Sequence, residues 1–165
     1  MESLQQCVKE YTELVQAGRI ATAYKGIMTF MTGLERFLAA QHPECNATAL
    51  YFGYMDMTYF AFTPPVLAAK KLKIAIVYLH DLGLFELWLG GANRKVQAEY
   101  IDLLTSRPHD GYMLSAVSPG VDSIIESRIA ERPDFDQPEE LMRVLERRWT
   151  GFVEDILAML EASHD

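Results

Sequence analysis

The sequence predicts an α+β protein in which a small four-stranded sheet is flanked by helices. Residues 50–91 hold three β-rich runs, separated by Thr63-Pro64-Pro65 and by Asp81-Leu82-Gly83. On both sides of this stretch, apolar residues recur at steps of three and four, which is typical of helices. No repeat, low-complexity tract or linker divides the 165 residues. We therefore expect one α+β domain over residues 1–165 with the element order ααβββαβαα.

Two helices are expected before the sheet. The first covers about residues 3–17, with Ser3 as its N-cap and Gly18 ending it in the left-handed conformation. The second covers about residues 20–40 and contains Gly26 and Gly33, which weaken a helix but permit another backbone to approach closely. The first helix carries an apolar stripe that we expect to be buried: Leu4, Cys7, Val8, Tyr11, Leu14 and Val15.

The sheet is predicted from three runs. The first, about residues 51–62, is apolar on both faces, so we expect it to be covered on both sides. The next two form a hairpin around the three-residue loop Asp81-Leu82-Gly83, which places Tyr78 opposite Glu86. This register predicts one pure core face: Ala75, Val77, Leu79, Phe85, Leu87 and Leu89. The other face is mixed: Ile74, Ile76, Tyr78, His80, Leu84, Glu86 and Trp88.

Four further elements complete the prediction. A helix is expected over residues 93–105 with Asn93 as N-cap, then a short strand over 112–117. Ser118-Pro119 favours the start of a short helix that runs to about Ile129. The last helix is expected from Asp136 to Ala162, opened by a capping box of Asp136 and Glu139. Two aromatic residues extend its apolar stripe beyond what one core needs, so a homo-oligomer is an alternative to a monomer: Trp149 and Phe152.

Composition and charge narrow the classes of function. The net charge of -8, from 23 acidic and 15 basic residues, disfavours non-specific nucleic-acid binding. The cluster Lys70, Lys71 and Lys73 is interpreted as a solvated strand edge. No apolar run approaches the ~20 residues that span a bilayer, and no signal peptide is recognisable. We therefore expect a cytoplasmic protein that does not contact a membrane.

The mixed sheet face is the main candidate site. Its predicted residues are Tyr54, Asp56, Thr58, Tyr78, His80, Glu86 and Trp88. Apolar walls with a few convergent polar groups are typical of small-molecule pockets, and a carboxylate beside aromatic rings has a raised pKa. The structural alternative is a helix packed on this face, with the two carboxylates hydrogen-bonded beneath it.

A second, weaker candidate is an anion site at the strand-to-helix turn. Its residues are Gly90, Gly91, Asn93 and Arg94, which combine glycine amides, a helix N-terminus and a cation. The turn matches neither GxGxxG nor the P-loop pattern, so an ordinary capped turn explains it as well. The four histidines and two cysteines show no metal or redox spacing, and we predict no metal and no cofactor.

Three functional hypotheses follow. The first is a non-enzymatic domain that binds a small molecule or a partner protein through the mixed face. The second is a hydrolase or transferase that uses Asp56 and Glu86 as acid and base. The third is a catalytically inactive restriction-endonuclease-like domain, because the motif of that fold needs a lysine where Glu86-Leu87-Trp88 has tryptophan.

Several blocks of the chain resemble a known family. At YFGYMDMTYFAFTP, KKLKIAIV, FELWLGG and GVDSIIE, the chain is similar to a family of small bacterial proteins of unknown function. The blocks spread from Tyr51 to Glu126. The resemblance implies a bacterial cytosolic domain and supplies no activity and no catalytic residues. One departure is Leu84, where we expect a basic residue in that family.

Overall fold

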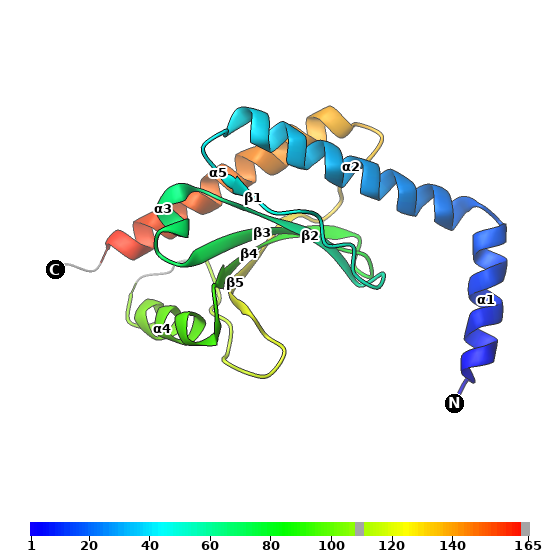
Figure 1. Ribbon diagram of the computed structural model, residues 1–165, viewed down its shortest axis with the longest axis horizontal. Helices are drawn as coiled ribbons and strands as arrows, with labels where there is room; N and C mark the ends of the chain where they lie inside the picture. The colour runs from blue at the N-terminus through cyan, green and yellow to red at the C-terminus, as the bar shows by residue number, and fades with distance from the viewer. Residues whose placement is uncertain (108–110, 163–165) are drawn as a thin grey trace.

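The fold is built on a five-stranded antiparallel sheet in which consecutive strands are neighbours, in the order β1-β2-β3-β4-β5 (Figure 1). The computed structural model describes residues 1–107 and 111–162. The strands are β1 (Asn46–Ala47), β2 (Met57–Thr63), β3 (Leu72–Leu79), β4 (Leu84–Gly91) and β5 (Ser123–Ala130). The helices are α1 (Leu4–Gln16), α2 (Arg19–Gln41), α3 (Pro65–Ala68), α4 (Arg94–Thr105) and α5 (Pro138–Glu161).

The α+β class is as predicted, but the four-stranded sheet and the order ααβββαβαα are wrong. The observed order is ααββαββαβα, with five strands. The two residues of β1 are too few to give a sequence signal, and they pair with the end of β2. The prolines after β2 begin the short helix α3, because proline at the first helical position has the required backbone angle already.

The segment before α5 differs most from the prediction. In place of a strand over residues 112–117 there is one isolated bridge, between Leu114 and Ile125. The helix expected after Ser118-Pro119 is instead strand β5. Ile125 and Ile129 are four residues apart, a spacing that suits one face of a helix and also suits one face of a strand. β-branched side chains favour the strand once a partner such as β4 is present.

The β3–β4 hairpin has a register one residue away from the prediction. Leu79 pairs with Leu84 and Tyr78 with Phe85, so the loop has four residues, 80–83. A slip of one residue moves every side chain of one strand to the other face. The predicted β4 side of the core is therefore right (Phe85, Leu87, Leu89), and the predicted β3 side (Ala75, Val77, Leu79) is wrong. The β3 residues of the main core are Leu72, Ile74, Ile76 and Tyr78, whereas Val77 is fully buried, as predicted, but on the opposite face of the sheet.

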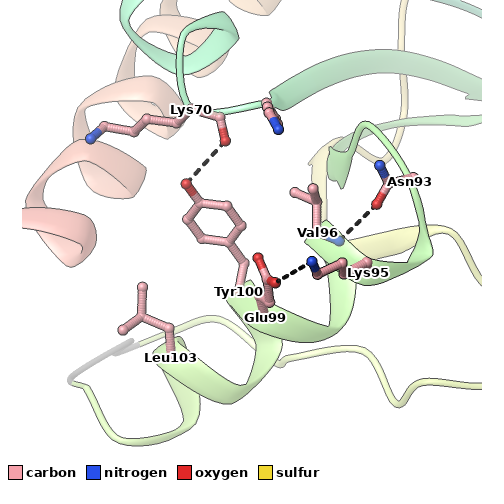
Figure 2. Close-up of a pocket in the computed structure, with 8 residues that line it drawn as sticks. Lys70, Asn93, Lys95, Val96, Glu99, Tyr100 and Leu103 are labelled. Atoms are coloured by element: carbon pink, nitrogen blue, oxygen red, sulfur yellow. Dashed lines mark hydrogen bonds and ion pairs between the residues drawn. The ribbon is translucent and has the colours of Figure 1, made fainter.

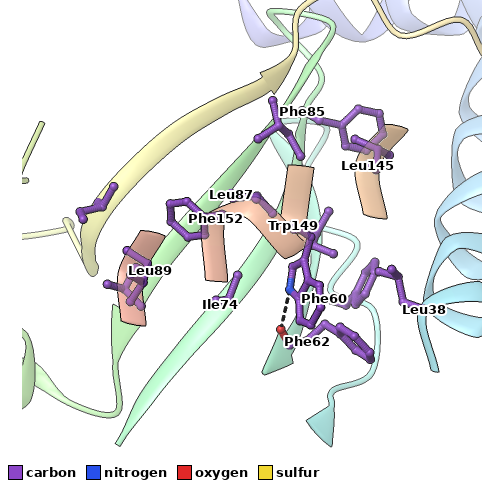
Figure 3. Packing of buried hydrophobic residues seen from close by; sticks show 14 of the residues in the cluster. Leu38, Phe60, Phe62, Ile74, Phe85, Leu87, Leu89, Leu145, Trp149 and Phe152 are labelled. Atoms are coloured by element: carbon purple, nitrogen blue, oxygen red, sulfur yellow. Dashed lines mark hydrogen bonds between the residues drawn. The ribbon is translucent and has the colours of Figure 1, made fainter. Parts of the chain in front are cut away.

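The main core lies between this sheet face and helices α2 and α5, which cross it side by side (Figures 1 and 3). Thr58, Phe60 and Phe62 of β2 face the same core and are fully buried. Trp149 of α5 is only 3% exposed, and its indole Nε1 donates to the Phe62 carbonyl oxygen at 3.1 Å. Trp149 and its neighbour Phe152 thus fill the core and do not extend an exposed stripe.

The ends of the helices follow the sequence in most places. Ser3 caps α1 within a capping box, Gly18 has a φ of 88°, and the Asn93 side chain caps α4. The predicted box of Asp136 and Glu139 is wrong, because α5 begins at Pro138 with no side-chain cap.

The prediction that α1 is buried is also wrong. None of its residues is buried, and Cys7 is exposed. Figure 1 shows the reason: α1 turns away from α2 at Gly18 and projects from the rest of the molecule.

Helix α4 lies on the opposite side of the sheet from α2 and α5, below the end at which β4 finishes.

Candidate functional site

The seven residues of the predicted mixed face lie in three places. Thr58, Tyr78 and His80 lie on the side of the sheet that α2 and α5 cover. Glu86 and Trp88 lie on the opposite face, because of the one-residue slip in the hairpin. Tyr54 and Asp56 belong to the turn before β2. The structure therefore brings together two subsets and not the whole set.

The subset around His80 ties the hairpin end of the sheet to α2. His80 Nε2 lies 2.8 Å from Thr58 Oγ1, whose hydroxyl donates to the Phe52 carbonyl at 3.2 Å. The His80 ring stacks on Tyr24 of α2, with centroids 5.9 Å apart. Desolvation lowers the pKa of His80, while the charges of Asp56 and Asp81 oppose that shift. These contacts connect the hairpin end of the sheet to α2, so the role of His80 here is structural.

The turn that carries Tyr54 and Asp56 has its own internal hydrogen bond. The Tyr54 amide donates to Asp56 Oδ1 at 2.9 Å, and this bond is the main cause that lowers the pKa of Asp56. Tyr54 is 92% exposed, and both oxygens of Glu86 accept from residues of the sheet, Trp88 and Arg128. Asp56 and Glu86 are therefore not paired in one cleft.

The face of the sheet opposite α2 and α5, which we call the open face, carries the second subset. It contains Tyr59, Ala75, Val77, Glu86, Trp88, Glu126 and Arg128. Glu86, 7% exposed, accepts from Trp88 Nε1 at 2.8 Å through Oε1 and from Arg128 Nε at 3.3 Å through Oε2. Both carboxylate oxygens are thus used to hold neighbouring side chains. The indole of Trp88 is fixed in orientation while its ring stays partly exposed.

A groove of about 240 Å³ lies beside Trp88 on the open face. Ala75, Trp88 and Glu126 form one row across β3, β4 and β5. Ala75 and Gly90 are small and leave room over the sheet next to the indole. The groove is lined by Met57, Tyr59, Lys73, Ala75, Trp88, Gly90, residues 120–123 and Glu126.

Helix α4 holds the wall of this groove. Arg94 Nη1 donates to the carbonyl oxygens of Ser118 and Val121 at 2.7 and 2.9 Å. The buried Gln97 donates through Nε2 to the carbonyls of Val121 and Ser123 at 2.8 and 3.0 Å. These four hydrogen bonds fasten residues 118–123 beside the sheet. Arg94, predicted as an anion ligand, is therefore occupied by the backbone of this wall.

The charged side chains that line the groove differ in whether they have an ion-pair or hydrogen-bond partner. Asp122 lies 3.5 Å from Arg94, and Glu126 accepts from the Ser123 hydroxyl at 2.9 Å. Lys73 has no ion pair among the residues that the structure describes. Glu126 likewise has no ion pair there, but it has the Ser123 hydrogen bond, whereas no side-chain hydrogen bond is found for Lys73 among the same described residues.

Sequence reasoning found Trp88 and Glu86 but missed Tyr59, Lys73 and Glu126 as their neighbours. Lys73 and Trp88 share a face only if the hairpin loop has four residues. Glu126 joins them only if residues 123–130 form a strand. The composition of Ser118-Pro119-Gly120, typical of a loop, was the available signal for the groove wall.

A larger hollow of about 430 Å³ lies between α4 and the residues before β3 (Figure 2). Lys70, Lys71 and Lys95 line it, and Lys95 Nζ lies 4.0 Å from the carboxylate of Glu99. The Tyr100 hydroxyl donates to the Lys70 carbonyl at 3.0 Å. Of the predicted anion-binding residues, Asn93 lines this hollow, but its side chain accepts from the Val96 amide at 2.9 Å. Gly90 lines the groove instead, so the predicted set is not gathered around one point.

Among residues 1–107 and 111–162, no group of three His, Cys, Asp or Glu side chains is placed to hold a metal ion. None of the helices there combines the length and the apolar character needed to cross a membrane.

The thiol of Cys45 is a weak acid in this structure. Burial, followed by the charge of Glu44, raises the pKa of Cys45 to about 11.

The fold and the groove define an α+β domain with an antiparallel meander, covered by two helices on one face and partly open on the other. Residues 4–160 match the family model described as a domain of unknown function, DUF7000. The chain belongs to this family, which agrees with the resemblance to a family of unknown function. Comparison with curated proteins and with solved structures gives no match. A bacterial origin stays a prediction.

Proposed function

We propose that this domain is a binding module that takes a small molecule into the groove on the open face. The observation that carries this proposal is the indole of Trp88, which Glu86 fixes at 2.8 Å and which borders the groove of about 240 Å³. Ligand pockets are mostly apolar concavities of ~300–1,000 Å³ with a few placed polar groups. At about 240 Å³, the groove is just below that range, so the ligand is small.

The chemistry of the lining favours a flat ligand with an acidic group. Trp88 and Tyr59 supply aromatic surface on which a planar ring can stack. Lys73 has no ion-pair partner in the described part of the chain, whereas Asp122 and Glu126 each have a polar contact. A carboxylate on the ligand therefore gives Lys73 the partner that it lacks.

A catalytic role has less support. Asp56 and Glu86 are not in one cleft, and both oxygens of Glu86 already accept hydrogen bonds. A binding module needs no convergent acid and base, which is why we propose binding.

Fluorescence titration tests the proposal. In a Trp149→Phe background, Trp88 is the remaining tryptophan, and its emission reports on the groove. The probes are one- and two-ring aromatic monocarboxylates, each compared with its neutral amide. We expect the carboxylates to change the emission and to bind about tenfold tighter than the amides, or ~1.4 kcal/mol.

The matched variants are Lys73→Met and Lys70→Met. Lys73→Met removes the preference for the carboxylate, while Lys70→Met, which alters only the other hollow, preserves it. Thermal shift on the wild type and on Trp88→Leu provides a second readout. A carboxylate that stabilises Trp88→Leu as much as the wild type contradicts the proposal, as does a panel in which no probe binds.

A further inference from the structure

Helix α1 presents an apolar stripe that its own chain does not cover. The large side chains of this stripe are all exposed, and Leu4 is 80% exposed. The helix adjoins α2, and it projects away from the sheet in Figure 1. An isolated helix of 13 residues is marginal in water, since helices of this length draw most of their stability from packing.

The spacing of the stripe is that of a helix that pairs with another helix. Leu4, Cys7, Tyr11 and Leu14 are separated by three, four and three residues. This spacing places Leu4 and Tyr11 at position a and Cys7 and Leu14 at position d of a heptad. Val8 and Val15 widen the stripe on one side at position e.

The charges of α1 argue against a membrane surface as its partner. Helices that lie in a membrane interface carry many Lys and Arg residues on their polar face. Between Leu4 and Gln16, α1 has the single cation Lys9 against Glu10 and Glu13. An acidic face is repelled by anionic lipid headgroups.

The same charges suit a second copy of the helix. The two rows that border the seam, positions e and g, hold one charged residue, Glu10. In a parallel pair, Glu10 lies beside Val15 of the second copy. In an antiparallel pair it lies near its own equivalent, because residue 10 is the middle of α1. Like charges in contact are destabilising, so the parallel arrangement is favoured.

We infer that α1 pairs in parallel with α1 of a second copy of this chain, so that the protein is a dimer. At roughly 100 Å² each, the six side chains of the stripe bury about 600 Å² per copy, and a standard interface needs ~800 Å² per partner. A second exposed apolar segment, which precedes β2 at the hairpin end of the sheet, is proposed to supply the remainder: Tyr51, Phe52, Tyr54 and Met55. The α1 stripe holds no residue that lines the groove on the open face, whereas Tyr51 of the second segment packs against the groove residue Tyr59, with ring centroids 4.9 Å apart.

Sedimentation velocity of the full chain at rising concentration tests the dimer. We expect a species of twice the chain mass in the wild type. Leu14→Glu places a charge in the seam and shifts this species to the monomer. Gln16→Glu adds the same charge on the opposite face of α1, at the same end, and leaves the dimer intact. Leu14 is 54% exposed in its own chain, so both variants keep the cooperative unfolding of the core, and Leu14→Glu loses at most the helicity of α1, which is marginal without a partner.

Oxidation tests the parallel arrangement. A parallel pair places Cys7 opposite Cys7 of the second copy, close enough for a disulfide. The other cysteine, Cys45, has a pKa raised to about 11 by burial, so its thiolate is scarce. Mild oxidant is therefore expected to give a covalent dimer that Cys7→Ser abolishes and Cys45→Ser does not. A monomer at all concentrations, or a dimer that survives Leu14→Glu, overturns the inference, and a dimer that Cys7 does not link overturns its parallel form.

Discussion

At the scale of single residues, the polar groups beside the sheet have two kinds of role. Glu86 fixes Trp88 and Arg128 on the open face, whereas Thr58 and His80 join the hairpin end to α2. Four of these five residues belong to the predicted site, and the fifth, Arg128, lies in a segment that the sequence predicts to be helical. The residue types alone do not predict which of these side chains lie on the same face of the sheet. That depended on strand register, which no single side chain determines.

His80 is expected to make stability depend on pH. Because desolvation lowers its pKa below the ordinary 6.5, the unfolded chain binds a proton more readily than the folded chain. The stabilisation from neutral His80 is full above pH 6.5 and decreases as the pH falls below it. Asp56, whose pKa is lowered from 3.8, loses its contribution only at more acidic pH.

Urea denaturation at neutral pH and at about one unit below the histidine pKa measures this effect. The variant His80→Gln keeps a donor for the Thr58 hydroxyl but has no titrating group. We expect its stability to decrease less over this interval than that of the wild type. An equal decrease in the two proteins would show that the pH dependence arises elsewhere.

At the scale of elements, the two glycines of α2 show how side-chain packing modifies the effect of helix propensity on stability. Both Gly26 and Gly33 lie in α2, and the sequence predicts close approach of another backbone at each. A Cβ added at Gly33 would lie 2.9 Å from Met142 Cε of α5, whereas one added at Gly26 meets nothing within 4 Å. Close packing is therefore found at Gly33, against a side chain, and not at Gly26.

Two alanine substitutions are expected to differ for this reason. Gly26→Ala gains helix propensity without a clash and should raise the free energy of unfolding by up to ~1 kcal/mol. Gly33→Ala gains the same propensity but must displace the end of Met142, so its net gain is smaller or absent. Chemical denaturation of the two variants in parallel measures the difference. Equal stabilisation by both would contradict the packing described for α2 and α5.

At the scale of the whole molecule, apolar surface is distributed unevenly. Helices α2 and α5 bury one face of the sheet, and Trp149 and Phe152, which the sequence left as a reason for oligomerisation, lie inside this core. The exposed apolar residues gather instead on α1 and at the hairpin end. The buried core thus carries a projecting helix whose apolar stripe is exposed.

Hydrogen exchange resolved by segment should show this division. In dilute protein, the amides of α1 are expected to exchange much faster than those of α5, because α1 has no buried residue. As the concentration rises, protection of α1 should increase while that of α5 stays constant, since α1 lies in the inferred seam and α5 does not. Protection of α1 equal to that of α5 in the most dilute sample would refute a detached helix.

By itself, the sequence determined the elements whose signals are local. Caps at Ser3 and Asn93, apolar steps of three and four, and the turn glycine at Gly83 marked α1, α2, α4 and the hairpin. Tertiary structure alone decided the one-residue register of that hairpin, the choice of strand over helix for β5, and the position of α1 outside the core. The physical reason is the range of the interactions. The hydrogen bonds of a cap or turn come from residues a few positions away in the chain. Strand register and burial depend on partners that are distant in the chain. An apolar stripe therefore predicts that a helix face is apolar, but not which surface covers it.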